Sequence, residues 1–266
     1  MSVAPVFARV RSLRGWQWLV RAHALFARAR MYWLLLILSY WLITVAMSLV
    51  PYIGVAVATL LKPVFAVGFL AAAWSLERAE SPRLGRLFDG FRSNIAALLP
   101  LGAVYAAGIA AALVLSAAMD GGALMRLALF GEAQPEGNIM ATPGIQSAML
   151  LAAVAAVPTL LALWFAPALI VFQDQPTFRA MATSLRAALA NPGAIIVYWA
   201  AVFLFWMVIP GAIVGMGAMF GKYGAVLGVA LATPLMLAIV AVIHVGDYVI
   251  YRDLFHHGET TAPTKR

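Results

Sequence analysis

Six apolar stretches dominate the sequence, and each is long enough to cross the hydrocarbon core of a membrane as a helix, which needs about 20 mostly apolar residues. Short turns at 51–54 and 217–224 join the first stretch to the second and the fifth to the sixth, so these neighbours should form helical hairpins. The pattern predicts an all-α polytopic membrane protein with about six transmembrane helices in three hairpins. The six stretches are Met31–Val50, Gly54–Trp74, Ile95–Met119, Gln146–Phe172, Ala194–Met216 and Gly224–Tyr251.

The composition excludes an ordinary soluble domain. Hydrophobic residues make up 64% of the chain and charged residues 11%, whereas soluble domains are about half apolar and roughly a quarter charged. Cysteine is absent, which excludes disulfides, thiolate metal sites and iron–sulfur clusters in this chain. The net charge of +8 would favour nucleic acid in a soluble protein. Here the basic residues flank apolar spans, so we expect no nucleic-acid partner.

The distribution of positive charge predicts the orientation. Fifteen of the eighteen Lys and Arg residues lie in the N-terminal segment, in the segments after the second and fourth spans, and in the C-terminal tail. Cytoplasmic segments are enriched in Lys and Arg, so both termini are expected in the cytoplasm of a bacterial inner membrane. The segment before Met31 has no uninterrupted apolar run, and the first span is therefore expected to remain in the membrane.

An amphipathic segment precedes each predicted hairpin. In 81–94, Ser81 can cap a helix that has Pro82 at its first position. Two interpretations are open: these helices lie in the membrane interface with their arginines toward anionic headgroups, or they pack together as a small cytoplasmic layer. The predicted apolar faces are Trp16, Leu19 and Phe26 in the first segment, Leu84, Leu87, Phe88 and Phe91 in the second, and Phe178, Met181, Leu185 and Leu189 in the third.

A repeat organises the chain as one integral membrane domain. The repeating unit is an amphipathic helix, a span, a turn and a second span with a proline (Pro63, Pro158 or Pro234) and an acid near its end (Glu77, Asp174 or Asp247). The chain is predicted to begin with an N-terminal amphipathic segment, 1–30, followed by hairpin 1 at 31–76. An amphipathic helix with hairpin 2 then occupies 81–172 and includes an external loop at 120–142. An amphipathic helix with hairpin 3 occupies 176–251, and a cytoplasmic tail follows at 252–266.

Five short motifs stand in order along the chain: Gly15-Trp16-Gln17-Trp18 with Phe26, Pro51-Tyr52-Ile53-Gly54, Pro63-Val64-Phe65 with Gly68, Leu87-Phe88-Asp89-Gly90-Phe91, and Asn191-Pro192-Gly193. Through these motifs the chain resembles a family of uncharacterised proteobacterial six-helix inner-membrane proteins. More distantly it is similar to the membrane domain of some bacterial glycerophosphodiester phosphodiesterases, whose catalytic partner is absent here, so the resemblance implies no activity. Lys62 departs from the family, in which we would expect a neutral residue.

Three ionisable residues within spans form a candidate intramembrane polar site, because such residues are costly there. His244 and Asp247 lie three apart on one helical face and could hold a proton or a cation. The alternative, which we favour, is a helix-end cluster in which Asp247 pairs with Arg252 or with a neighbouring arginine. Lys62 either contacts a substrate or, as we favour, snorkels or pairs with Asp120, Glu132 or Glu136 of the external loop.

No catalytic, cofactor or metal site is predicted. His256-His257, with Asp253 and Glu259 nearby, supplies too few ligands for a metal centre, and no phosphate-binding loop or nucleophile elbow occurs. We therefore expect a protein that is not an enzyme.

The expected role is an accessory, assembly or lipid-interacting factor, and the alternative is a small transporter or channel for an apolar or lipid-like substrate. Expected partners are anionic membrane lipids, another membrane protein, or a second copy. A second copy would associate through the glycine-rich Gly211–Gly228 region, where Gly-x-x-x-Gly spacing allows helices to approach closely.

Overall fold

The computed structural model describes residues 7–50, 53–131 and 139–256, and within them all regular structure is helical. The all-α fold with three hairpins is therefore confirmed. Its elements are α1 (Arg14–Ala27), α2 (Arg30–Ser48), α3 (Ile53–Glu77), the 3₁₀ helix η1 (Leu84–Arg92), α4 (Ile95–Asp120), α5 (Ala123–Phe130), η2 (Ile139–Ala141), α6 (Ile145–Trp164), α7 (Ala166–Gln173), α8 (Thr177–Ala190), α9 (Pro192–Phe203), the π-helical segment η3 (Leu204–Val208), α10 (Ile209–Ala218) and α11 (Gly221–Phe255).

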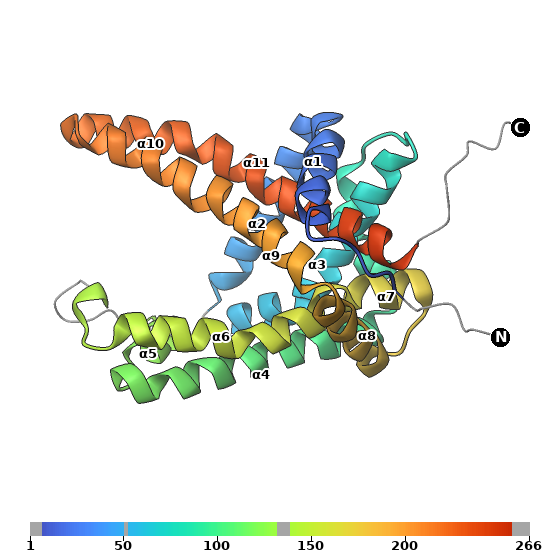
Figure 1. The fold of residues 1–266 in the computed structure, drawn as a ribbon, viewed down its shortest axis with the longest axis horizontal. Helices are drawn as coiled ribbons and strands as arrows, with labels where there is room; N and C mark the ends of the chain where they lie inside the picture. The colour runs from blue at the N-terminus through green and yellow to red at the C-terminus, as the bar shows by residue number, and fades with distance from the viewer. Residues whose placement is uncertain (1–6, 51–52, 132–138, 257–266) are drawn as a thin grey trace, which may run out of the picture.

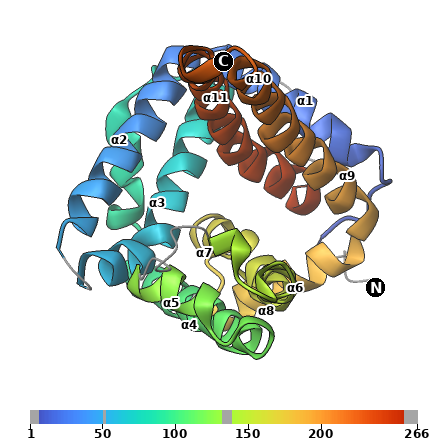
Figure 2. The same cartoon turned by 90° about the vertical axis from the view of Figure 1, so that its left-hand side faces the viewer.

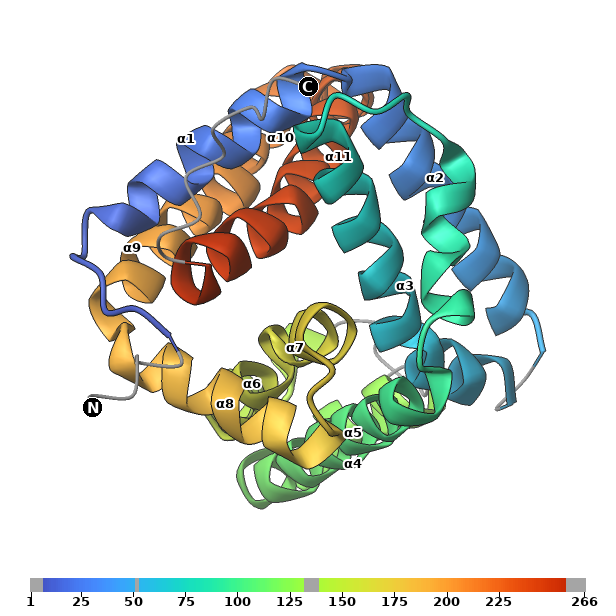
Figure 3. The ribbon, with the colours of Figure 1, turned by 90° about the vertical axis from the view of Figure 1, so that its right-hand side faces the viewer.

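The hairpins are joined at one end and diverge toward the other. In Figure 1, α4–α6 and α9–α11 run away from the end that holds α1, α7 and α8. Viewed from the diverging end, the hairpins are spread around the axis of the molecule (Figure 2). From the opposite end, α1 lies across α9 and α11, and η1 packs alongside α3 (Figure 3). The buried core, with Trp18, Trp33, Phe165 and Tyr198 among its largest side chains, gathers where the hairpins converge.

Within the described residues, six helical segments are long and apolar enough to cross a membrane, and they match the six predicted spans to within a few residues. No more than 44% of the most apolar stretch of any of them is buried. Such a large exposed apolar surface has to face lipid. The longest helix, α11, has 35 residues and is about 50 Å long, so it extends well past a hydrocarbon core of about 30 Å.

The fourth span is two helices, whereas one was predicted. Pro167 has no N–H to donate to the carbonyl of Leu163, and α6 ends at Trp164. Ser184 of α8 fills the break: the N–H of Phe165 donates to its Oγ (3.0 Å), and the same Oγ donates to the carbonyl of Leu161 (2.7 Å). A neighbouring helix thus satisfies the interrupted backbone, as membrane helices require.

The fifth span contains the π-helical segment η3 immediately before Pro210. Because Pro210 cannot donate to the carbonyl of Trp206, the hydrogen-bond register widens there and then returns to α in α10. Insertions of this kind are frequent at functional sites.

The predicted α-helix over 81–94 is wrong in type and start. Arg83 is extended, and the segment is a 3₁₀ helix that begins at Leu84, so Ser81 does not cap it. With three residues per turn, Leu87 and Gly90 share the buried face, while Phe88 stays exposed. Gly90 and Gly68 permit this close packing, because a Cβ on either would overlap the backbone of the facing element.

The predicted apolar face of α8 is largely turned outward, and other residues make most of the buried surface of this helix. Small residues, including Ala180, Ser184 and Ala187, are buried against the rest of the protein, whereas Phe178 and Leu189 are 75% and 63% exposed. Small side chains let α8 approach its neighbours closely, and the large apolar ones are left on the outer surface. An in-chain packing face and an outward apolar face therefore coexist on this helix.

Two predicted boundaries change. The segment after Tyr251 is not a tail at first, because α11 continues to Phe255 and includes Asp253. The expected external loop contains α5, and the Asp120 carboxylate caps that region by accepting from the N–H groups of Gly122 and Leu124. Glu132, Glu136, His257 and Glu259 lie outside the described residues, as do Pro51 and Tyr52.

Some glycines of the Gly211–Gly228 region pack closely against a neighbouring helix, and others do not. A Cβ on Gly217 or Gly224 would overlap the backbone of the partner helix, so these residues serve the contact between α10 and α11 within the chain. Gly211 and Gly215 have no neighbouring atom within 4 Å of an added Cβ.

Candidate functional site

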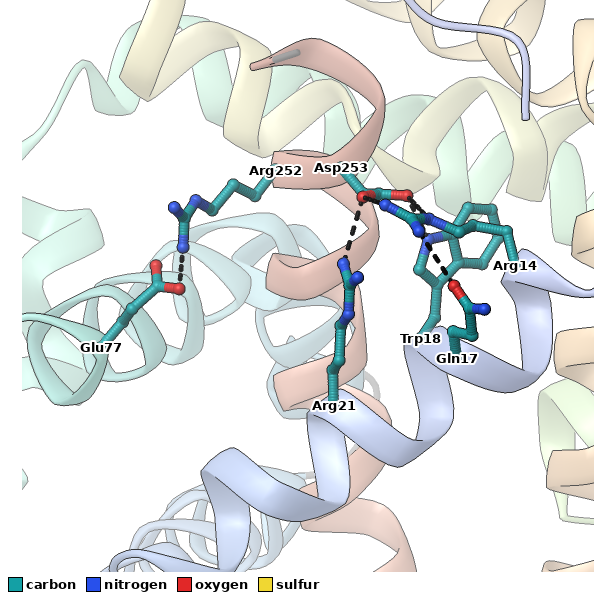
Figure 4. A network of polar contacts seen from close by, with 7 residues as sticks. All are labelled: Arg14, Gln17, Trp18, Arg21, Glu77, Arg252 and Asp253. Atoms are coloured by element: carbon teal, nitrogen blue, oxygen red, sulfur yellow. Dashed lines mark hydrogen bonds and ion pairs between the residues drawn. The ribbon is translucent and has the colours of Figure 1, made fainter. Parts of the chain in front are cut away.

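Polar side chains concentrate on the last three turns of α11, where the hairpins converge. Arg252 forms an ion pair with Glu77 at the end of α3 (Figure 4). The hydroxyl of Tyr248 donates to the other oxygen of Glu77 at 2.5 Å. This pairing joins hairpin 1 to hairpin 3. It also overturns the expectation that Arg252 would neutralise Asp247.

The neighbouring residue, Asp253, points to the opposite side of α11 and binds α1 (Figure 4). Its carboxylate accepts from Nε and Nη2 of Arg14 at 2.8 and 2.7 Å and from Nε1 of Trp18 at 2.8 Å. Arg21 adds a 3.3 Å contact. The hydrogen bond to Asp253 raises the pKa of the Arg14 guanidinium, although the partial burial of that group lowers it. The Asp253 side chain is only 8% exposed, so this charge is desolvated and fully paired.

His244 and Asp247 lie together, as predicted, one to two turns before this network. The Asp247 carboxylate accepts from Nε1 of Trp164 at 2.8 Å, and its second oxygen lies 3.7 Å from Nδ1 of His244. The His244 ring stacks on Phe69 of α3 at 4.1 Å between centroids. Asp247 thereby links α11 to α6, and His244 links it to α3.

Lys62 lies apart from this pair. Its Nζ is 3.0 Å from the hydroxyl of Tyr105 on α4 and 4.3 Å from the centre of that ring. Of the three acids named as possible partners, Asp120 does not pair with Lys62, because its carboxylate caps α5. The other two, Glu132 and Glu136, lie outside the described residues.

An apolar pocket of about 420 Å³ opens between α1, α9, η3 and α11. Its lining includes the predicted apolar face of α1, and Trp16 stacks on Phe205 of the π-helical segment at 6.4 Å. Trp16 and Val20 remain about half exposed, so the pocket is partly open. The lining residues are Trp16, Leu19, Val20, His23, Phe26, Val202, Phe205, Leu235, Ala238, Ile239, Val242 and Ile243.

Asn191 anchors the chain that leads into α1. Its side-chain oxygen accepts from the N–H of Val10 at 2.8 Å, and its Nδ2 donates to the carbonyls of Ala8 (3.0 Å) and Ala187 (2.9 Å). The residue is 2% exposed, so three of its four hydrogen-bonding positions are used in a buried site. This explains the Asn191-Pro192-Gly193 motif as a structural anchor.

The described residues contain no group of three His, Cys, Asp or Glu side chains arranged to hold a metal ion. His256 packs against Tyr251, with 5.2 Å between ring centroids. Sequence reasoning missed Asp253, Asn191 and the pocket. One signal in the sequence could have indicated that Asp253 is buried. Tyr248, Tyr251 and Leu254 continue the apolar helical pattern beyond the predicted end of the span, so the helix that contains Asp253 stays against the protein.

Six apolar helices with exposed outer faces define a multi-pass helical membrane protein. Compared with known proteins, the chain is 32% identical over 261 residues to a probable inner membrane protein of Burkholderia thailandensis, with 96% of this chain and 95% of that protein covered. The chain belongs to the same family of inner membrane proteins. No family model and no solved structure matches it. The resemblance to the membrane domain of glycerophosphodiester phosphodiesterases stays a prediction.

Proposed function

We propose that this protein is a non-enzymatic, lipid-interacting factor whose pocket beneath α1 holds an acyl chain of an anionic phospholipid. The pocket is the observation that carries the proposal. Its lining is apolar except for His23, which by itself offers no acid–base or nucleophilic pair. Pockets of this size suit lipid-sized ligands.

The position of α1 supports a whole phospholipid as the ligand. The apolar stripe of α1 faces the pocket, while Arg14 and Arg21 lie on the other side of the helix and reach Asp253. Arg28, just past the end of α1, is exposed. An interfacial helix of this kind places apolar side chains at the acyl boundary and arginines near phosphate groups. With the termini in the cytoplasm, as the charge distribution favours, the lipid belongs to the inner leaflet.

Native mass spectrometry of the purified full-length protein tests the proposal, with phosphatidylglycerol and phosphatidylcholine titrated separately. Val20→Trp fills the pocket from an exposed position and should abolish retention of the tightest lipid. Arg28→Gln should reduce the preference for phosphatidylglycerol roughly fivefold, since one arginine near an anionic surface contributes about 1 kcal/mol. Leu13→Trp, at a 75% exposed position outside the pocket lining, is the matched control. Equal lipid retention by the wild type and Val20→Trp would overturn the proposal.

A transporter or channel for an apolar or lipid-like substrate is the second candidate. The divergence of the hairpins and the interruption of span four favour it, because broken helices line substrate sites in many transporters (Figure 2). Reconstituted vesicles with fluorescent phospholipid distinguish the two. Protein-dependent exchange of lipid between leaflets supports transport, and its absence together with stable lipid retention supports the accessory role.

A further inference from the structure

Three acids take part in the polar contacts of the last three turns of α11, and their positively charged partners differ. Glu77 pairs with Arg252, and Asp253 pairs with Arg14 and Arg21. Among the described residues, Asp247 has an ion-pair contact only with His244, at 3.7 Å, and this contact carries opposite charge only when the imidazole is protonated. Asp247 therefore lacks a permanent cation.

The Asp247 carboxylate also has unused acceptor capacity. A carboxylate offers about four lone-pair positions. The hydrogen bond from Nε1 of Trp164 occupies one of them, and the His244 contact is longer than a hydrogen bond. The side chain is 29% exposed, so a ligand can reach it.

The Trp164 ring that donates to Asp247 belongs to a cluster of aromatic rings. The centroid of the Trp164 ring lies 5.6 Å from that of Trp199 and 6.2 Å from that of Tyr198, both of which belong to α9. Trp199 is 42% exposed. The Tyr198 hydroxyl is buried and has no hydrogen-bond partner among the described residues. It lies against Gly246, the residue before Asp247, where a Cβ would overlap it.

The depth of Asp247 points to the headgroup region. It lies 26 residues after Gly221, which is about 39 Å along an α-helix. If α11 starts at the far edge of a hydrocarbon core about 30 Å thick, a tilt of about 30° still leaves roughly 34 Å of depth. Asp247 then lies at the level of the headgroups in the leaflet where the hairpins converge.

A carboxylate without a permanent counter-charge, beside the half-buried Trp164 and the exposed Trp199, is an arrangement that can recognise an organic ammonium group through charge and cation–π attraction. We propose that Asp247, Trp164 and Trp199 bind such a group, carried either by a phospholipid headgroup or by a soluble amine. The site faces α6, whereas the acyl pocket faces α1, so this proposal stands independently of the proposed function.

Thermal stabilisation of the full-length protein in phosphatidylglycerol nanodiscs tests the site, with choline, ethanolamine and potassium chloride as probes at equal ionic strength. We expect a saturable shift with the two ammonium compounds and none with potassium. Asp247→Asn, which keeps an acceptor for Trp164, should abolish the shift. Asp89→Asn is the matched control, because that side chain is 25% exposed and pairs with Arg86 on η1. Equal shifts in the wild type and Asp247→Asn, or an equal response to potassium, would overturn the proposal.

Two further arms complete the test. Trp199→Leu keeps the carboxylate and should weaken ammonium affinity about fivefold, so the proposal stays testable if Asp247→Asn fails to fold. An unchanged affinity in this variant would refute the aromatic contribution. Nanodiscs with phosphatidylethanolamine distinguish the sources: loss of the soluble-amine response there assigns the site to the headgroup, and an undiminished response assigns it to a soluble amine. The pocket variant Val20→Trp should leave the ammonium response unchanged.

Discussion

Replacing Asp253 by Asn should loosen the attachment of α1 to α11. Removing one partner of a buried, hydrogen-bonded ion pair costs about 3–5 kcal/mol. Arg14 is 32% exposed and Arg21 51%, so water can solvate both guanidinium groups once the carboxylate charge is gone. The amide oxygen of the asparagine also keeps one acceptor, which Trp18 can use. We therefore expect Asp253→Asn to lower the free energy of separating α1 from α11 by about 2–3 kcal/mol.

Hydrogen–deuterium exchange of α1 in nanodiscs measures this directly. If α1 exchanges by detaching from α11, a loss of 2–3 kcal/mol speeds exchange of its amides roughly 30- to 150-fold. Exchange in α4, which has no contact with Asp253, should not change. In a double-mutant cycle, Arg14→Gln should add little once Asp253 has been replaced, because the two residues share one interaction.

The matched control is Glu80→Gln. Glu80 also contacts two arginines, Arg78 and Arg86, but its side chain is 37% exposed, so its loss should cost no more than about 1 kcal/mol. Exchange of α1 amides that rises less than threefold in Asp253→Asn would refute the reasoning. It would mean that packing of Trp18 and Phe26, rather than the ion pair, holds α1.

Other substitutions probe the fold. Ser184→Ala leaves the N–H of Phe165 and the carbonyl of Leu161 unpaired, and should lower the free energy of unfolding by about 1–3 kcal/mol in denaturation experiments. Gly224→Leu should separate α10 from α11 and lower thermal stability strongly, whereas Gly211→Leu should leave it unchanged; the reverse order would contradict the assigned packing. A green fluorescent protein fused after Arg266 should fluoresce and an alkaline phosphatase there should be inactive, as a cytoplasmic C-terminus requires.

Apolar length located the six spans because the bilayer fixes the length of a spanning helix whatever its neighbours are. The same reasoning failed inside span four. Proline in a membrane helix can bend it or break it, and the outcome depends on whether another helix supplies a polar group. Here Ser184, about twenty residues later in the chain, makes the break stable. No periodicity in 146–172 carries that information.

The amphipathic segments show a second limit of prediction from the sequence. Helical spacing assigns the largest apolar residues to the buried face, which holds where the surroundings are water. Phe178 and Leu189 are exposed on α8 because the outer surroundings we infer are the acyl boundary, so burial against protein falls to the small residues. Small-residue faces are therefore the better guide to packing in this chain, as Gly217 and Gly224 show on hairpin 3.

Polar pairing was the least predictable feature. Arg14 and Asp253 are 239 positions apart, and Glu77 joins Tyr248 across 171 positions. The sequence places these residues near span ends on one side, which narrows the possible partners without selecting one. The expected pair of Asp247 with Arg252 was reasonable from their spacing and is wrong, because the end of α3 brings Glu77 to Arg252.

These contacts connect α11 directly to three other helices. Within its last three turns it binds α3 through Arg252, α1 through Asp253 and α6 through Asp247. The hairpins are thus tied together at their converging ends, whereas their diverging ends have few buried side chains to resist movement. The acyl pocket and the ammonium site lie on different faces of this helix. A ligand at either can influence the other only by shifting α11 or the helices tied to it, and any such coupling has to be reciprocal. Comparing ammonium affinity with and without bound phosphatidylglycerol, and lipid affinity with and without choline, measures that coupling from both sides.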